Sequence, residues 1–422
     1  MFMDSATSPV IKHNDIRDGD TVMLQLLNGE IRSMKVQKDS NITLGRIGSF
    51  PGVHLLGQTY GLTYEIVEKE LKVIPPRTLQ DVEDTDATNE LINDDDFVQP
   101  MALEEIESWK RAGMHASVGF FLKLPTVDTS ENLVFLKDII NRQIEQHANY
   151  SLKTAYSKEK YKKRKEAKYL KAFTTVEPTL FNVCTYWFRK NPTRIRDIRP
   201  DTLSQIMNMA NIRPGGRYIA VDDAAGILVC GILDRMGGQG RLITICDVDC
   251  PPAYPTLTQM NFNHEATISI LSSLNWATAQ PDYISVMAPE PVTEVKSERH
   301  RSRLQKRKVV TDAVSNTREE LFSGEFDALV ISCEFDILQV VEVLSPYLAG
   351  SASIVVHSPH IQTLVELQAK LRSLPNFIAP SLTESWLRCY QVLPGRTHPM
   401  MNMSGSGGYL LHSIKIYDVA KT

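Results

Sequence analysis

The first well-patterned stretch of the chain alternates between apolar and polar positions. Residues 21–27 alternate, Asn28 and Gly29 supply a tight turn, and residues 31–36 resume the alternation. Glycines and prolines then separate several further short apolar runs. This pattern predicts a small β-barrel-like domain in residues 1–100, which ends in an acidic linker.

From residue 101 onward the apolar residues recur at helical spacing, which predicts a helical connecting region over residues 101–192. Residues 119–130 contain a proline and are predicted to be an inserted loop. Farther on, tyrosines alternate with a dense set of cations: Lys158, Lys160, Lys162, Lys163, Arg164, Lys165, Lys168 and Lys171. Cations on adjacent helical turns repel one another, and a polyanion would relieve that repulsion. We therefore expect these eight residues to bind RNA, with a solvated helix face as the alternative.

A second basic cluster occupies residues 296–308 and follows a stretch rich in proline. Its cations are Lys296, Arg299, Arg301, Arg303, Lys306, Arg307 and Lys308. The preceding prolines predict a flexible loop. Three roles stay open for it: a nuclear import signal, an RNA-binding arm, or a solvated insertion.

Residues 217–249 read as strand, tight turn, helix, turn and strand, which is the opening unit of a doubly wound sheet. The segments that follow predict a helix at 266–274, parallel strands at 283–287, 327–332 and 353–356, and antiparallel strands at 386–393 and 409–416. Parallel strands closed by an antiparallel hairpin are typical of methyltransferases. The predicted fold class is therefore α/β, with a Rossmann-like class I methyltransferase fold in residues 193–422.

The turn of this opening unit departs from a cofactor-binding turn. Such turns need glycines, because the backbone must adopt unusual dihedral angles and approach the ligand closely. The chain instead has Asp222, Asp223 and Ala224 before a single glycine, Gly226. The carboxylates would oppose an anionic ligand group, and the alanine methyl would occupy its space. We predict a degenerate turn that binds no cofactor.

Two further positions where methyltransferases of this class carry functional side chains are also weak. An acid follows the second strand as Asp247 or Asp249, and Ser332-Cys333-Glu334 ends the fourth strand. Glu334 could serve as a general base, but a solvated loop acid is the better interpretation. The sequence thus predicts neither a catalytic residue nor a metal site.

Composition adds two exclusions. The hydrophobic and charged fractions, 42% and 23%, are those of a globular protein, and no apolar run is long enough to span a membrane. The six cysteines form no paired framework, which suits a reducing compartment.

Three segments together resemble a known family: LKTAYSKEKYKKRKEAKY at 152–169, AVDDAAG at 220–226 and DRMGGQGRL at 234–242. The chain is similar to the non-catalytic subunits of eukaryotic tRNA (adenine(58)-N(1))-methyltransferase. The resemblance implies a 2:2 heterotetramer in the nucleus. In it, this chain helps to hold tRNA while a catalytic partner binds S-adenosylmethionine and methylates the T-loop adenine.

Two other hypotheses remain at this point. One is an active S-adenosylmethionine-dependent RNA methyltransferase with a divergent turn, and Asp222 and Asp223 argue against it. The other is a scaffold protein in translation control that makes no direct contact with RNA.

Overall fold

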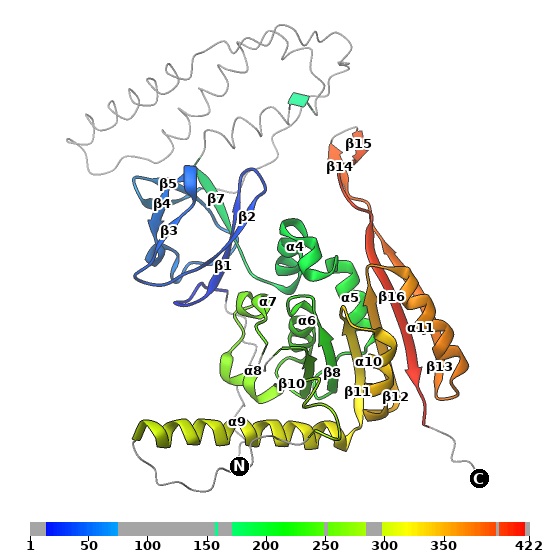
Figure 1. Ribbon diagram of the computed structural model, residues 1–422. Helices are drawn as coiled ribbons and strands as arrows, with labels where there is room; N and C mark the ends of the chain where they lie inside the picture. Colours follow the sequence, from blue (N-terminus) through cyan, green and yellow to red (C-terminus); the bar gives the residue numbers. More distant parts are fainter. Residues whose placement is uncertain are drawn as a thin grey trace, which may run out of the picture. The chain divides into compact units, whose positions relative to one another are not determined.

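The computed structural model describes residues 14–74, 157–158, 171–248, 252–283, 298–393 and 396–417. The chain divides into two compact units (Figure 1). Asp15–Val176 and Cys389–Met400 form the N-terminal unit, and the remainder of the chain forms the C-terminal unit.

The N-terminal unit is built on a five-stranded antiparallel sheet with the order β2-β1-β7-β5-β6. The strands are β1 Thr21–Leu26, β2 Ile31–Lys35, β5 Thr63–Val67, β6 Glu70–Ile74 and β7 Ala172–Val176. A separate pair, β3 Asn41–Thr43 and β4 Ser49–Pro51, joins the same core through Ile42 and Phe50. This unit also contains the short 3-10 helices η1 Gly45–Ile47 and η2 Gly52–Leu55, and the strand pair of residues 390–393 and 396–399.

The central strand of this sheet comes from far along the chain. Phe173 of β7 is fully buried and stacks on Phe50 and Tyr64, with ring centroids 5.1 and 5.6 Å apart. Strand β7 lies inside the range that the sequence assigned to the helical connecting region, and the two units divide after Val176 instead of at residue 192. Burial of one aromatic residue against two others thus recruits a distant segment into the sheet. The predicted loop at 119–130 lies outside the described residues.

The C-terminal unit contains a seven-stranded sheet with the order β10-β9-β8-β11-β12-β16-β13. The strands are β8 Arg217–Asp222, β9 Arg241–Cys246, β10 Leu271–Asn275, β11 Phe326–Ser332, β12 Leu348–Ser358, β13 Phe377–Trp386 and β16 Ser406–Lys415. The first five in this order of pairing are parallel, and β16 pairs antiparallel with both β12 and β13. The predicted α/β methyltransferase-like architecture is confirmed.

Helices pack on this sheet around a continuous aliphatic core (Figure 1). They are α4 Leu180–Lys190, α5 Pro200–Met209, α6 Ile227–Met236, α7 Pro255–Gln259, α8 His264–Ile270, α9 Glu298–Ser323, α10 Ile337–Leu344 and α11 Ile361–Ser373, with 3-10 turns η5 Pro192–Ile195 and η6 Ser345–Tyr347. Local signals fix several ends: the Thr179 hydroxyl caps α4, and Gly237 ends α6 in the left-handed region. No helix in the described part of the chain has the length and hydropathy needed to cross a membrane.

Three predicted elements were wrong. The first is the predicted helix at 266–274, which ends at Ile270, and its last residues form strand β10. Most of the predicted strand at 283–287 lies outside the described residues, and Tyr283, the part that is described, is in no strand. Because β10 contains two adjacent serines, its sequence lacks the alternation of apolar and polar residues that predicts a strand. Pairing with β9 makes this segment a strand.

The other two concern a loop and a hairpin. Residues 298–308 begin the long helix α9 instead of a flexible loop. The predicted strand at 386–393 divides into the end of β13 and a separate strand β14, Tyr390–Leu393, which pairs with β15, Arg396–Pro399.

Candidate functional site

The turn between β8 and α6 is organised by the carboxylate of Asp222. Its Oδ1 accepts hydrogen bonds from the backbone N–H groups of Ala224 (2.7 Å) and Gly226 (3.3 Å), and its Oδ2 accepts one from Val229 (3.0 Å). Val229 is the third residue of α6. The first N–H groups of a helix have no intrahelical acceptor, so they normally attract an anion. Here a side chain of the same turn takes that place.

This carboxylate is buried, and the environment raises its pKa. Burial is the largest cause, and the three backbone N–H groups oppose it, which leaves the pKa of Asp222 at about 6. Asp222 is therefore mostly ionised at neutral pH, held by backbone dipoles instead of a cation. The ligand-facing donors of this turn are thus already satisfied.

A second segment closes the turn from outside. A Cβ added at Gly226, whose φ is +87°, would lie 2.5 Å from the Cβ of Tyr254. The hydroxyl of Thr256 donates to the carbonyl oxygen of Ala225 at 2.8 Å, and the Thr256 amide donates to the same oxygen at 3.4 Å. The one glycine that remains is therefore covered by the chain itself, and no space is left there for a ligand.

Asp223 belongs to a charged cluster at the C-terminal ends of β8 and β11. Its Oδ2 accepts a hydrogen bond from the amide of Glu334 at 2.8 Å, and its own amide donates to the carbonyl oxygen of Ser332 at 2.9 Å. Arg196, in the left-handed region with φ 52°, reaches this cluster, and its Nη1 lies 3.4 Å from Glu334 Oε1. Burial raises the pKa of Asp223, and the nearby carboxylate of Asp247 adds to the shift.

The end of the fourth strand holds no reactive group in the described residues. The Glu334 side chain is 83% exposed to water, and its carboxylate forms an ion pair with Arg196. Burial raises the pKa of Cys333 to about 12, so this thiol stays protonated. Ser332 Oγ lies 3.1 Å from Nδ1 of His357, and burial lowers the pKa of His357 to about 4, so the imidazole is neutral. The contact between Ser332 and His357 links the ends of β11 and β12.

The residues at this end of the sheet do not fit S-adenosylmethionine. Its carboxylate would compete with Asp222 for the same N–H groups, and Tyr254 and Thr256 cover the backbone that a ligand would approach. The predicted degenerate turn at Asp222, Asp223, Ala224 and Gly226 therefore forms a closed internal structure.

The remaining predicted residues are dispersed. Asp247 is exposed just after β9, and Asp249 lies outside the described residues. Of the eight basic residues proposed for RNA, the structure describes only Lys158, half-buried in a helical turn, and Lys171, exposed before β7. Among the described residues, no group of three or more His, Cys, Asp and Glu side chains could hold a metal ion.

Two residues of this site had no signal in the sequence. Arg196 and Tyr254 come from loops that lie 26 or more residues from Asp222 along the chain. Neither belongs to a recognisable motif, and only the tertiary structure brings them to the turn.

Comparison with known proteins agrees with this architecture. The chain is 26% identical to the tRNA (adenine(58)-N(1))-methyltransferase non-catalytic subunit TRM6 of Debaryomyces hansenii, covering 94% of this chain and 85% of the relative. It is also 26% identical to the subunit of the same name from Schizosaccharomyces pombe, covering 96% and 93%.

Among solved structures, an S-adenosylmethionine-dependent O-methyltransferase from Thermotoga maritima superposes with a TM-score of 0.52 at 12% identity, over 96% of both chains, and so shares the fold. The Gcd10p family model matches residues 15–311, which is more than half of the chain. The resemblance noted in the sequence is confirmed, and the chain belongs to the Gcd10p family.

Proposed function

We propose that this chain is the non-catalytic, tRNA-binding subunit of a tRNA (adenine(58)-N(1))-methyltransferase complex. The observation that carries the proposal is the Asp222 carboxylate, which satisfies three N–H groups of the turn that binds cofactor in active methyltransferases. Relatives that span nearly the whole chain are named non-catalytic subunits of this enzyme. The chain has kept the fold of an enzyme and closed its ligand site.

The catalytic partner binds S-adenosylmethionine in this proposal, and two copies of each subunit form the complex. Support for pairing comes from large apolar side chains exposed on the C-terminal unit at the end of β13. Trp386 is 64% exposed and Leu387 is 41% exposed. Exposed aromatic side chains of this size are typical of protein interfaces. Replacing Trp386 by Ala should reduce co-purification of the partner, and Val365→Ala on α11, also exposed, is the control.

RNA contact is assigned to the basic segment that contains Lys158, Lys160, Lys162, Lys163, Arg164, Lys165, Lys168 and Lys171. Changing Lys162, Lys163, Arg164 and Lys165 together to Gln should weaken tRNA binding by the assembled complex and flatten its dependence on salt. Unchanged binding would favour a scaffold role in translation control.

A nuclear location completes the proposal, and its support is the presence of two clusters rich in lysine and arginine. A fluorescently tagged chain should accumulate in the nucleus. Glutamine substitution in each cluster separately would then identify which one directs import.

The decisive experiment measures S-adenosylmethionine binding by calorimetry, for the chain alone and with its catalytic partner. We expect no binding to the chain alone, and both binding and tRNA methylation when the partner is added. Binding by the chain alone, if it were lost on substitution of Asp247, would establish an active methyltransferase with a divergent turn.

A further inference from the structure

Helix α9 has two halves with different surroundings. Its C-terminal half, from about Val314, packs on the sheet through Thr317 and Leu321, which are buried, and Phe322. Its N-terminal half is exposed along almost its whole length. The helix runs past the N-terminal ends of β8 and β9, and its first half continues beyond them (Figure 1).

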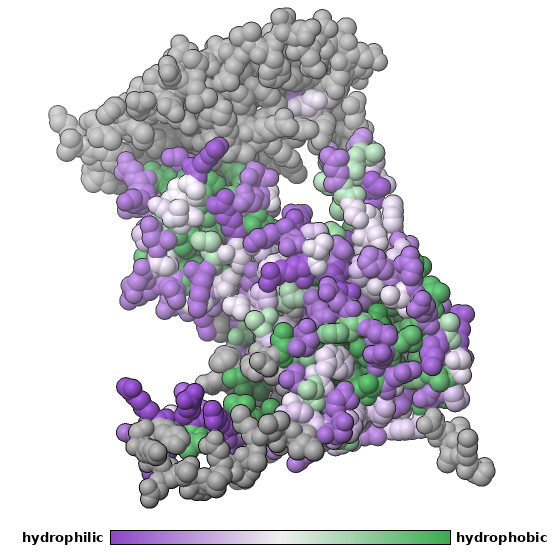
Figure 2. Space-filling model, in the orientation of Figure 1, coloured by the Kyte–Doolittle hydropathy of each residue, from purple (hydrophilic) through white to green (hydrophobic). Residues whose placement is uncertain are grey.

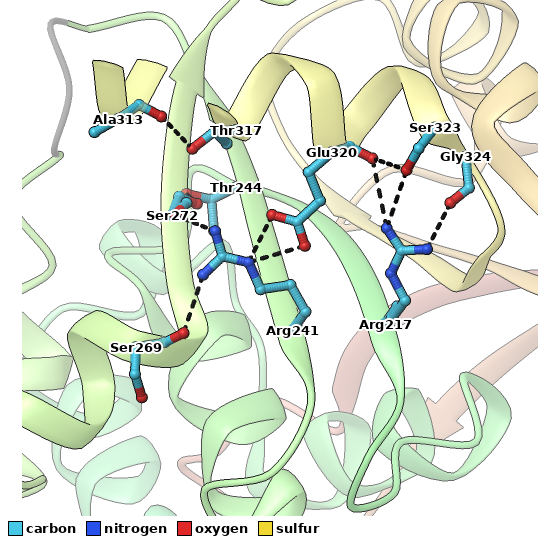
Figure 3. A network of polar contacts seen from close by, with 10 residues as sticks. All are labelled: Arg217, Arg241, Thr244, Ser269, Ser272, Ala313, Thr317, Glu320, Ser323 and Gly324. Atoms are coloured by element: carbon cyan, nitrogen blue, oxygen red, sulfur yellow. Dashed lines mark hydrogen bonds and ion pairs between the residues drawn. The ribbon is translucent and has the colours of Figure 1, made fainter. Parts of the chain in front are cut away.

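Three arginines fix the docked half, and Figure 3 shows two of them, Arg217 and Arg241. Arg241, the first residue of β9, directs its Nε to both carboxylate oxygens of Glu320 at 2.8 and 2.9 Å, and its Nη2 donates to Ser272 Oγ at 2.6 Å. Arg217, the first residue of β8, donates to the Gly324 carbonyl oxygen at 2.9 Å. Arg318 donates to the carbonyl oxygens of Thr278 and Gln280 from the helix itself. These contacts anchor α9 from one end.

The free half carries six cations within ten residues and no acid between them: Arg299, Arg301, Arg303, Lys306, Arg307 and Lys308. All six side chains are exposed, and none forms a salt bridge in the described part of the chain. Arg299, Arg303 and Arg307 repeat every four residues, so they lie along one face and repel one another. Figure 2 shows the hydrophilic surface over this end of α9.

The position of these six cations at the start of an anchored helix favours binding of a polyanion. The cations occupy the first turns of a helix of 26 residues, where the helix dipole is also positive, so the dipole does not compensate them. Glu298, the first residue of the helix, is the one acid in its first turn and leaves most of this charge unbalanced. A run of ten helical residues is roughly 15 Å long, which spans several phosphates of a nucleic-acid strand. Because the docked half is anchored, the cations are held in place before a ligand arrives.

We infer that the free half of α9, residues 299–308, is a second RNA-binding surface of this chain, which contacts the phosphate backbone of the tRNA without reading its sequence. The inference rests on the proposed function, because it takes tRNA as the polyanion. RNA is favoured over an acidic peptide because Arg299, Arg303 and Arg307 repeat along one helix face while the other cations lie around it, an arrangement that suits extended phosphate contact. In the described part of α9, Val309 and Val310 are the exposed large apolar side chains beside them, which is little apolar surface for a protein interface.

The test uses the full chain co-purified with its catalytic partner and a labelled, unmodified tRNA transcript. Arg303→Gln with Arg307→Gln removes two cations from one face of α9. We expect the affinity for tRNA to fall by about 5- to 20-fold near physiological salt, and the slope of log affinity against log salt to decrease by about one to two. Arg303→Lys with Arg307→Lys keeps the charge and should retain most of the affinity.

The matched control is Lys370→Gln with Arg372→Gln, which removes two exposed cations from α11 and should leave tRNA binding unchanged. If the complex binds tRNA and the α9 variant binds it equally well, the inference fails while the proposed function stands. That result would direct the search to an acidic protein partner. If the parent complex does not bind tRNA, the proposed function fails first and the inference with it.

Discussion

At the C-terminal edge of the seven-stranded sheet, the chain itself closes the turn between β8 and α6. Asp222 takes the helix N–H groups, and Arg196 lies against Glu334. At the N-terminal edge, Arg217 and Arg241 anchor a helix whose first half exposes six cations. The edge where enzymes of this fold work is closed, and the opposite edge carries unsatisfied charge. A protein that loses one function of a fold can thus keep the fold as a support for another surface.

The largest effect is expected from opening the closed edge at Asp222. Asp222→Ala leaves three N–H groups without their acceptor in a buried site, so the free energy of unfolding should fall by about 3 to 5 kcal/mol. Urea denaturation of the purified chain measures the change. Asp223→Ala loses one hydrogen bond and is the smaller control. If Asp222→Ala left stability unchanged and created cofactor binding, the carboxylate of Asp222 would block a cofactor site without stabilising the fold.

Gly226→Ala tests the cover over the same turn. The new methyl would collide with Tyr254, and the residue would keep a left-handed φ, so we expect a loss of about 2 to 3 kcal/mol. Combining it with Tyr254→Gly, which removes the Cβ as well as the ring, should relieve the collision but not the backbone strain. If the double variant lost as much stability as the sum of both single losses, Tyr254 would not press on this turn.

The pH dependence of stability distinguishes two buried groups at the closed edge. The folded pKa of His357 is about 4, below its usual value of 6.5, so its contribution is present above pH 6.5 and is lost as the pH falls toward 4. The folded pKa of Asp222 is about 6, above its usual value, so its protonation opposes that loss over the same range.

His357→Gln removes the first of these contributions. Between pH 7 and pH 5 the parent should therefore lose about 2 kcal/mol more stability than His357→Gln does. Unfolding curves at the two pH values test this directly. Equal losses in both proteins would mean that burial does not lower the folded pKa of His357.

At the opposite edge, Glu320→Gln should cost about 1 kcal/mol, because it weakens a partly exposed ion pair with Arg241 while keeping the hydrogen-bonding shape. The same change should also weaken tRNA binding modestly by loosening the anchor of α9. Glu319→Gln, one residue earlier and exposed, is the matched control.

The smallest effect on stability is expected at the free half of α9. Arg303→Gln with Arg307→Gln removes repulsion between cations on adjacent turns, so stability should stay the same or rise by a few tenths of a kcal/mol. Far-ultraviolet circular dichroism and thermal unfolding measure this. A large loss of helix would mean that these arginines hold the structure, which would remove the basis for assigning them to RNA.

The sequence by itself determined the α/β class, the opening strand–turn–helix–strand unit and the degenerate character of its turn. Those features are local: strand and helix periods follow from neighbours in the chain, and a missing glycine is visible at its own position. The sequence also located both basic clusters, because the charge of each side chain can be read at its own position.

Only the tertiary structure decided how those features are used. Strand β7 joins the N-terminal sheet because Phe173 finds two aromatic partners more than 100 residues away, and β10 is a strand because β9 pairs with it. Residues 298–308 are helical because the far half of α9 is anchored to the sheet. The turn is closed because Arg196 and Tyr254 reach it from other loops. Each of these outcomes depends on contacts between segments that no short-range pattern encodes.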